Sequence, residues 1–402
     1  MQTNAAQASH YYSVYFMGVW LFYALFSSVY IFPKGLPQPA DIILITAVVP
    51  SLLLFALNNK GNIDVLYIIG GVFALLTFAI NWVNFAFNPD DRLIKSTMYY
   101  PYNFAVFCFV VYLLRMRPKP VCRLTYYCLA IAVFVQLAWV VFFPDPGVSR
   151  MTGGFKNPNQ LAYWSLLTAG MIFFIKRNEK LNLFDIGLMC ILTYIEFVTL
   201  SKAGIISFLV LFTYMLFTPQ ITRTARALIF CLLLVISSYS IINPALVINT
   251  VQKIKTIERV WQDIAAIGTE KKEDPEGRGY NRLWLFPHYN VIGAGEGAFW
   301  RFMTQHSSRE IHSGLATMLF AYGILGFALF GFFLTLIFWP QPFYVWLLFG
   351  FILMFSVTHQ AFRFTHFWVL LGFAHGTWHY CSARTKQKRF PRLTPLYTRI
   401  PE

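Results

Sequence analysis

Residues 310–338 read EIHSGLATMLFAYGILGFALFGFFLTLIF, a short polar segment that runs directly into a long apolar one. No charged residue occurs between Ser313 and Phe338. A stretch of this length and apolarity is typical of a helix that crosses a bilayer, which requires roughly 20 residues. The sequence therefore predicts a membrane helix whose entrance carries a carboxylate, Glu310, and an imidazole, His312. General-base chemistry at the boundary between water and lipid suits such a position.

The composition of the whole chain agrees with this interpretation. Of its 402 residues, 57% are hydrophobic and only 12% are charged, and the mean hydropathy is +0.55. Soluble domains carry about a quarter charged residues. The apolar runs are long and unbroken, whereas the strands of a membrane barrel alternate between apolar and polar residues. We therefore expect an all-α, polytopic membrane protein that forms a single domain over residues 1–402.

Hydropathy divides the chain into about twelve transmembrane helices. The predicted spans are residues 15–33, 40–57, 64–86, 98–114, 124–143, 161–175, 183–200, 204–217, 226–248, 313–338, 343–358 and 364–381. Two spans within 161–217 are short for a bilayer core of about 30 Å. Short helices can instead enter the membrane partway and line a cavity. One long loop, 250–312, separates the ninth and tenth spans, and a basic tail occupies 382–402.

The charge of the short loops orients the chain. One set of alternate loops, together with the C-terminal tail, holds sixteen lysines and arginines, and the opposite set holds seven outside the long loop. Positive charge accumulates in cytoplasmic loops, and long loops are left out of this count. Both termini are therefore expected in the cytoplasm and the loop 250–312 on the external side. These flanking positions also explain most of the net charge of +15, so no nucleic-acid partner is expected.

The cysteines do not indicate a metal site or a disulfide framework. All six lie in or beside apolar runs, none lies in the long loop, and none has the spacing of a zinc ligand pair. We therefore expect no metal and no cofactor.

Two polar clusters on the predicted external side lie early in the chain. Residues 149–160 contain Arg150, Asn157 and Asn159, with glycines that permit tight turns. This segment is either an anion site or a solvated hairpin. Lys202 stands between two apolar runs, where lysine either snorkels to lipid headgroups or lines a cavity and pairs with a phosphate.

Two further clusters lie in the long loop. Arg278 and Arg282 share one face if their segment is helical, and arginine holds phosphate oxygens through bidentate hydrogen bonds. Glu296 lies in Gly-Ala-Gly-Glu-Gly (293–297). This run lacks the strand context of a nucleotide-binding loop, so it is interpreted as a turn that brings backbone amides or Glu296 close to a ligand.

Glu310 and His312 close the loop, and His359 and Arg363 flank a short external turn that can line the same site. A carboxylate near a histidine favours the imidazolium, whereas burial favours the neutral ring. A general base requires the neutral form, and the sequence alone leaves both states open.

These motifs resemble those of the O-antigen ligase and Wzy-type polysaccharide polymerase superfamily. His312-Ser313, followed after nine residues by Gly323-Ile324-Leu325-Gly326, is similar to the ligase pattern H-[NSQ]-x9-G-x-x-[GTY]. Arg282 with Gly293 is similar to the polymerase pattern R-x10-G. Residues 150–159 resemble the R-x-x-G-x-x-x-N-P-N segment, and residues 200–204 resemble L-S-R-x-G with Lys202 in place of arginine. The resemblance covers about residues 145–330 and the many-span layout.

The resemblance implies a GT-C-like, metal-independent glycosyltransferase of the bacterial inner membrane with a periplasmic active site. Such an enzyme transfers a glycan from undecaprenyl diphosphate to an acceptor hydroxyl, with inversion at the anomeric carbon. The implied partners are the lipid-linked donor, a glycan or lipid A core acceptor, membrane lipid and a chain-length regulator. We favour a polymerase of O-antigen or exopolysaccharide repeat units; a ligase that uses the lipid A core is the alternative.

The roles of individual residues follow from the same resemblance. His312 is the expected base, with Glu310 or Glu296 orienting it or contacting sugar hydroxyls. The departing diphosphate requires fixed cations, for which the candidates are Arg278, Arg282, Lys202 and Arg150. Weaker candidates for sugar or acceptor binding are Glu296, Asn157, Asn159, His359 and Arg363.

Two other classes of function compete with this one. A glycosidase uses two carboxylates, but the basic residues around Glu296 and Glu310 suit a diphosphate better than a neutral glycan. A polytopic transporter fits the number of spans. Against it, the sequence has no internal half repeat, and its charges collect on one external face rather than at the midplane.

Overall fold

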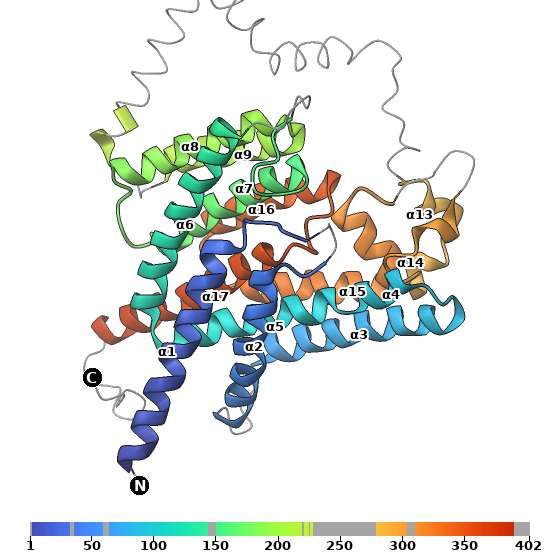
Figure 1. Cartoon of the computed structure of the whole chain (residues 1–402), viewed down its shortest axis with the longest axis horizontal. Coiled ribbons are helices and arrows are strands. Elements are labelled where there is room, and N and C mark those ends of the chain that lie inside the picture. The colour runs from blue at the N-terminus through green and yellow to red at the C-terminus, as the bar shows by residue number, and fades with distance from the viewer. Residues whose placement is uncertain are drawn as a thin grey trace, which may run out of the picture.

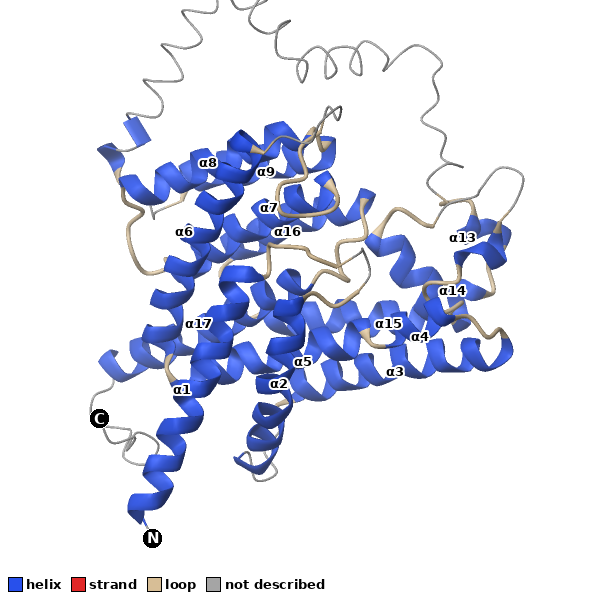
Figure 2. Ribbon diagram, in the orientation of Figure 1, coloured by secondary structure: helices blue, strands red, loops and turns tan. Residues whose placement is uncertain are grey.

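The computed structural model describes residues 2–32, 36–58, 64–143, 150–218, 221–224, 226–227, 279–303 and 310–389. These residues form helices joined by turns and loops (Figure 2), with one isolated bridge between Leu181 and Ile221 and no strand among them. The all-α class predicted from the sequence is therefore confirmed for the described part of the chain.

Helices coincide with eleven of the twelve predicted spans (Figure 1). They are α1 (Gln2–Phe26), α2 (Pro39–Asn58), α3 (Val65–Phe87), α5 (Tyr99–Met116), α6 (Pro118–Phe142), α7 (Pro158–Ile175), α8 (Leu183–Thr199), α9 (Lys202–Phe217), α15 (Gly314–Phe338), α16 (Phe343–Thr358) and α17 (Thr365–Arg389). A short helix, α4 (Asp91–Thr97), precedes α5. The remaining predicted span, 226–248, lies almost entirely outside the described residues.

Four of the described helical segments are long and apolar enough to cross a membrane. They are Val65–Phe87, Asp91–Met116, Pro118–Phe142 and Gly314–Phe338. Large apolar side chains also point outward from these helices; Leu75 and Phe142, for example, are 70% and 73% exposed. Apolar surface on this scale marks a membrane or protein interface, and together with the helix lengths it indicates a membrane protein.

Two boundaries differ from the prediction. The first helix ends at Phe26 instead of near residue 33, because the chain turns there and the side chain of Gln38 accepts hydrogen bonds from two backbone amides of the turn (2.9 and 3.0 Å). The last helix continues to Arg389, so the first part of the predicted tail 382–402 is helical. The tail beyond residue 389 lies outside the described residues.

Polar side chains determine where several helices begin. Asp64 accepts a hydrogen bond from an amide in the first turn of α3 (3.2 Å), and Asn182 and Asp185 form a reciprocal capping box at the start of α8. Ser313 caps α15 in the same way (3.2 Å). Because Ser313 marks the start of α15, the preceding Glu310 and His312 lie at the entrance of that helix.

The centre of the bundle is α17, which packs against α5 and α7. Large aromatic side chains fill this contact, and Trp164 and Trp368 are 1% and 0% exposed. Tyr99, the first residue of α5, lies beside Arg363 in the turn before α17; the distance from the guanidinium carbon to the ring centroid is 5.6 Å. Both helices therefore start at the same end of the bundle and run to the opposite end.

The described part of the predicted external loop contains local structure. Two short helices, α13 (Arg282–Leu285) and α14 (Tyr289–Ile292), and the 3-10 turn η1 (Phe299–Phe302) lie beside α15 (Figure 1). Phe302 and Phe320 pack together with ring centroids 5.1 Å apart. The segments 250–278 and 304–309 of the predicted loop lie outside the described residues.

Candidate functional site

A break in α15 joins two of the motifs found in the sequence. Gly323 has φ 67° and ψ −179°, outside the helical region. In an unbroken helix each carbonyl accepts from the amide four residues later. Here the carbonyls of Phe320 and Ala321 instead accept hydrogen bonds from the amides of Ala294 and Gly295, at 2.9 Å each. The run 293–297 and the glycine motif of α15 therefore form one backbone joint.

This joint requires glycine at position 323. A Cβ atom there would lie 2.2 Å from the carbonyl oxygen of Val291, and the backbone conformation is one that only glycine adopts readily. We predict that Gly323→Ala lowers the free energy of unfolding by about 1–3 kcal/mol, measured by thermal unfolding of the protein in detergent.

The matched control is Gly331→Ala, in the same helix, where no atom lies within 4 Å of the added Cβ. That substitution is expected to be neutral or to stabilise the helix by roughly 0.5–1 kcal/mol. Equal effects of the two substitutions would show that the break at Gly323 does not constrain the fold.

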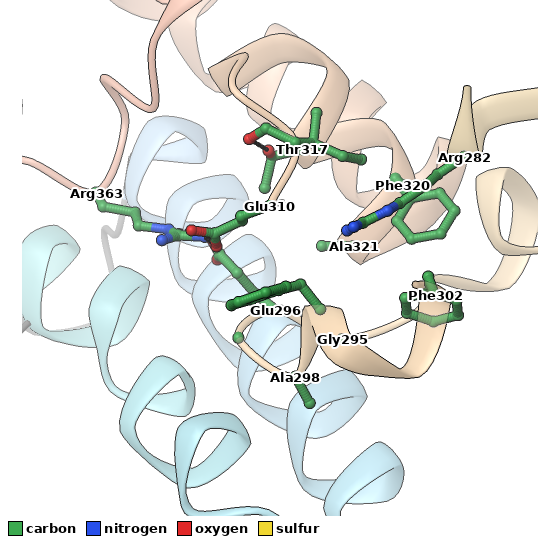
Figure 3. A pocket seen from close by; sticks show the side chains of 13 residues that line it. Arg282, Gly295, Glu296, Ala298, Phe302, Glu310, Thr317, Phe320, Ala321 and Arg363 are labelled. Carbon is green, nitrogen blue, oxygen red and sulfur yellow. Dashed lines mark hydrogen bonds and ion pairs between the residues drawn. The ribbon is translucent and has the colours of Figure 1, made fainter. Parts of the chain in front are cut away.

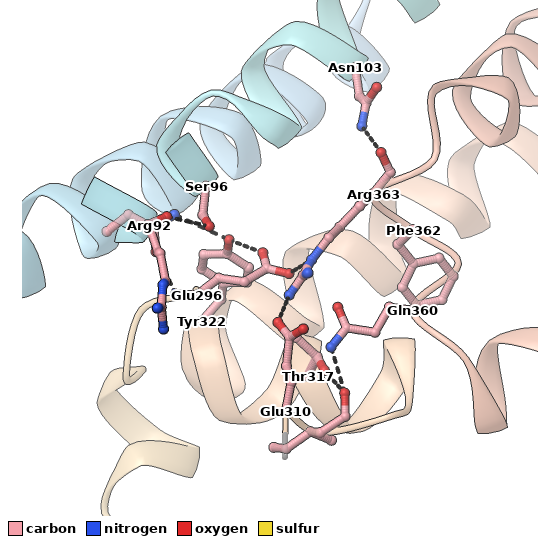
Figure 4. Close-up of polar contacts among 12 residues, drawn as sticks. Arg92, Ser96, Asn103, Glu296, Glu310, Thr317, Tyr322, Gln360, Phe362 and Arg363 are labelled. Carbon is pink, nitrogen blue, oxygen red and sulfur yellow. Dashed lines mark hydrogen bonds and ion pairs between the residues drawn. The ribbon is translucent and has the colours of Figure 1, made fainter. Parts of the chain in front are cut away.

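Glu296 is placed by the joint in a buried polar network (Figure 4). Its side chain is 1% exposed and accepts hydrogen bonds from the Tyr322 hydroxyl and from the Arg363 guanidinium. Its backbone amide donates to Oδ1 of Asn81 in α3 (2.7 Å). Tyr322 and Arg363 thus hold the carboxylate of Glu296, and Asn81 holds its backbone.

Arg363 connects Glu296 to the entrance of α15. The same guanidinium donates to Glu310 (2.5 Å), so it lies between two carboxylates (Figure 4). Its backbone carbonyl accepts a hydrogen bond from Asn103 of α5 (3.0 Å), which fixes the turn before α17. Arg363 therefore ties the external loop, α5 and the start of α17 to one point.

The two carboxylates are held in different electrostatic environments. Burial raises the pKa of Glu296 above its ordinary value, although Arg363 and Tyr322 act in the opposite direction. Burial also opposes ionisation of Glu310, but the charge and hydrogen bond of Arg363 outweigh it and hold the pKa of Glu310 below its ordinary value. Both carboxylates form ion pairs with Arg363, but the effect of burial prevails on the pKa of Glu296 and that of Arg363 prevails on the pKa of Glu310.

A small pocket adjoins this network (Figure 3). It has a volume of about 30 Å³, enough for water but not for a sugar ring, and aromatic residues of η1 and α15 form one wall. Its polar lining consists of Arg282, Glu296, Glu310, Thr317 and Arg363. Arg282 is only 2% exposed, and its guanidinium extends towards the space between Glu310 and Phe302. The structure therefore brings together four of the charged residues that the sequence singled out.

His312 lies next to the pocket but does not line it. Its side chain is exposed, and Nδ1 is 2.5 Å from the backbone carbonyl oxygen of Glu310. A carbonyl oxygen only accepts, so this contact places a proton on Nδ1. In the neutral ring Nε2 then keeps its lone pair, as a base requires.

Arg150, Asn157 and Asn159 form a second cluster, at the start of α7. The Arg150 guanidinium donates to the Thr199 carbonyl (2.9 Å) and to Oδ1 of Asn159 (2.6 Å), and Asn157 caps α7. None of these side chains lines the pocket. Their contacts connect the start of α7 to the end of α8. In the described structure these side chains therefore stabilise the local path of the chain.

The two clusters lie at the same end of the bundle. Phe155 packs on Phe364 with ring centroids 6.2 Å apart, and the latter residue belongs to the turn that carries Arg363. His359 caps the end of α16, where its carbonyl accepts a hydrogen bond from Gly314 (2.9 Å). Its side chain contacts Thr358 and Phe355 instead of the pocket.

The predicted cation Lys202 does not join the described pocket. Lys202 is exposed at the first position of α9 and is not among the pocket residues. Arg278 lies outside the described residues. Arg282 and Arg363 are therefore the arginines that line the described pocket.

Three residues of the network were not singled out by the sequence. Tyr322 directly precedes Gly323 in residues 310–338, but nothing in the sequence indicates that its hydroxyl contacts Glu296. Asn81 is one of two asparagines, with Asn84, in the largely apolar helix α3, a pattern that marks an intramembrane polar contact. Arg301 donates to Asn84 (3.1 Å) and to the Ala294 carbonyl, and so fixes the run 293–297.

Comparison with protein-family models and with curated proteins finds no match to this chain. Among the described residues, no group of three or more His, Cys, Asp or Glu side chains is placed to hold a metal ion. The pocket is lined by two guanidinium groups that attract anions and two carboxylates with separated pKa values, and an exposed imidazole lies beside them.

Proposed function

We propose that this protein is a membrane glycosyltransferase that polymerises oligosaccharide repeat units carried on undecaprenyl diphosphate. The observation that carries the proposal is that Arg282, Glu310 and Arg363 line one pocket at the entrance of an apolar helix, beside the exposed ring of His312. A lipid-linked diphosphate has its anionic head and its apolar tail at such a boundary. The resemblance of the His312 and Arg282 motifs to those of the superfamily adds to this support.

The proposed reaction is an inverting transfer. The acceptor hydroxyl oxygen forms a bond to the anomeric carbon while the bond from that carbon to the diphosphate oxygen breaks. The hydroxyl proton goes to Nε2 of His312, and the bonding electron pair leaves with the diphosphate. Arg282 stabilises the charge that develops on the leaving group, and Glu310 keeps Arg363 in position.

Binding of a diphosphate in this pocket requires a net positive charge there. Two arginines are balanced by two carboxylates when both carboxylates are ionised. Protonation of Glu296, which its burial favours, leaves a net positive charge for the diphosphate. The pocket must also widen to admit a substrate.

The finer topology is part of the same proposal. The twelve spans are predicted from hydropathy, and the cytoplasmic termini are predicted from the loop charges. The bacterial inner membrane and the periplasmic site are implied by the resemblance. The shared position of the pocket and the start of α7 at one end of the bundle agrees with a single external face.

The deciding experiment offers two acceptors to the purified protein with an undecaprenyl-diphosphate oligosaccharide. A ladder of products formed from the donor alone supports a polymerase, and product that forms only with lipid A core supports the ligase alternative. Uptake of the donor into vesicles without any new glycosidic bond would instead identify a transporter and overturn the proposal.

Arg282→Lys tests the assignment of the diphosphate site. Lysine keeps the charge but loses the planar pair of donors, so we predict a fall in turnover of roughly 10²-fold with little change in melting temperature. The control is Arg301→Lys, where the lost contacts are to Asn84 and a backbone carbonyl; stability should fall more than turnover. Unchanged kinetics in Arg282→Lys would remove this residue from the diphosphate site.

A further inference from the structure

A second cavity lies at the opposite end of the helix bundle. Its volume is about 220 Å³, and it is lined by Val111, Leu114 and Arg115 of α5 and by Gly376 and His379 of α17. The first residue of α5, Tyr99, is beside Arg363 in the pocket described above. The helical rise from Tyr99 to Arg115 is about 24 Å, so the second cavity lies near the other face of the membrane.

The wall of this cavity is amphiphilic. Val111 and Leu114 form an apolar side, and Arg115 and His379 supply a charged guanidinium and an exposed imidazole. Arg115 donates to the hydroxyl of Tyr67 (2.8 Å), and its guanidinium lies over the same ring, 5.3 Å from the centroid. These contacts hold the arginine head at the mouth of the cavity.

A buried histidine adds hydrogen-bonding capacity beside the cavity. His375 is 3% exposed, and neither ring nitrogen has a hydrogen-bond partner among the described residues. Its ring centroid is 4.3 Å from that of His379, which lines the cavity. A buried ring N–H without an acceptor is unfavourable, and an anionic oxygen in the adjacent cavity would offset that cost.

The surrounding charge is predominantly basic. The sequence places Arg117, Lys119 and Arg123 directly after Arg115, at the end of α5 and the start of α6. The carboxylate whose charge acts on His379 is Asp64, and its side chain is engaged in capping α3. The cavity therefore attracts anions, and its apolar side favours a ligand that also carries an acyl chain.

We propose that this cavity binds the phosphate-bearing headgroup of an anionic phospholipid at the face predicted to be cytoplasmic. Basic pockets between membrane helices on that face are suited to such headgroups. The guanidinium of Arg115 and the imidazole of His379 contact the phosphate, while Val111 and Leu114 contact the start of the acyl chains. The site is separate from the glycosyl-transfer pocket and stands whether or not the proposed activity is correct.

Native mass spectrometry of the full chain in detergent tests the proposal with phosphatidylglycerol and phosphatidylcholine as the added lipids. The wild type is expected to retain phosphatidylglycerol in preference to phosphatidylcholine. Arg115→Gln and His379→Gln should each weaken that retention, by about fivefold for the arginine. Equal retention of the two lipids, or unchanged retention in both variants, would overturn the proposal.

Two further variants separate binding from folding. Arg123→Gln removes one exposed charge from the same face without touching the cavity and should leave retention unchanged. Tyr67→Phe removes the hydrogen bond to Arg115 but keeps the charge, so it should retain most of the binding. A loss in Arg123→Gln as large as in Arg115→Gln would show that only the general surface charge matters.

Competition with inorganic phosphate tests whether the ligand is a lipid or free phosphate. Added at millimolar concentration, inorganic phosphate is expected to compete only weakly with phosphatidylglycerol, because it makes no contact with the apolar side of the cavity. Displacement of the lipid by phosphate at equal concentration, with the same dependence on Arg115, would identify free phosphate as the ligand and overturn the lipid assignment.

Discussion

Replacing His312 by alanine is expected to reduce glycosyl transfer by about 10²–10⁴-fold, the usual contribution of a general base. The protein should insert and fold as the wild type does, because the ring is exposed and its described contact is with the carbonyl of Glu310. The measurement is the rate of polymer formation by purified protein at saturating lipid-linked donor, together with its melting temperature.

The matched control for this prediction is His288→Ala. His288 is also exposed and lies in the same described segment, 279–303, as Arg282, with its ring tilted against that of Tyr289 at 4.2 Å between centroids. Its loss should leave the rate within a fewfold of wild type. A normal rate in His312→Ala, or an equal loss in both variants, would remove His312 as the base and would direct attention to Glu310.

Replacing Arg363 by methionine is expected to have the largest effect on stability. The substitution leaves Glu296, whose side chain is 1% exposed, without the cation that compensates it, and it leaves Glu310 facing a second carboxylate. Removing one partner of a buried pair typically costs about 3–5 kcal/mol. The measurement is the melting temperature or the fraction of monodisperse protein in detergent at about pH 8.

The pH dependence and a double variant distinguish this mechanism from a simple loss of packing. Arg363 lowers the folded-state pKa of both carboxylates. Without it the pKa of Glu296 rises further above its unfolded value and burial raises that of Glu310, so stability should increase as the pH falls through the folded-state pKa. The double variant Arg363→Met/Glu296→Gln removes the buried charge and should recover much of the loss. A deficit that is independent of pH and is not rescued by Glu296→Gln would argue against the buried charge as its cause.

Hydropathy was sufficient to predict the helices because the length of an apolar run can be read from the local sequence. Eleven predicted spans coincide with helices, and Ser313 begins α15 at the predicted position. The end of α1 was placed too late because apolar residues continue past Phe26, and the turn there depends on Gln38, twelve residues further along the chain. The number of spans and the topology remain predictions.

The members of the site were easier to predict than their contacts. Residue type and position identified Arg282, Glu296, Glu310 and Arg363, and these residues line one pocket. The sequence did not show that Arg363 would hold both carboxylates, because that contact joins positions 67 and 53 residues apart. Arg150 and Lys202 were placed with the diphosphate by resemblance, and the described pocket does not include them.

The break at Gly323 has a consequence for how this protein can diversify. The carbonyls it exposes accept hydrogen bonds from the amides of Ala294 and Gly295, so part of the attachment of residues 293–297 to α15 is made by main-chain atoms. Because these two bonds use only backbone atoms, substitutions of side chains elsewhere in residues 279–303 do not remove them.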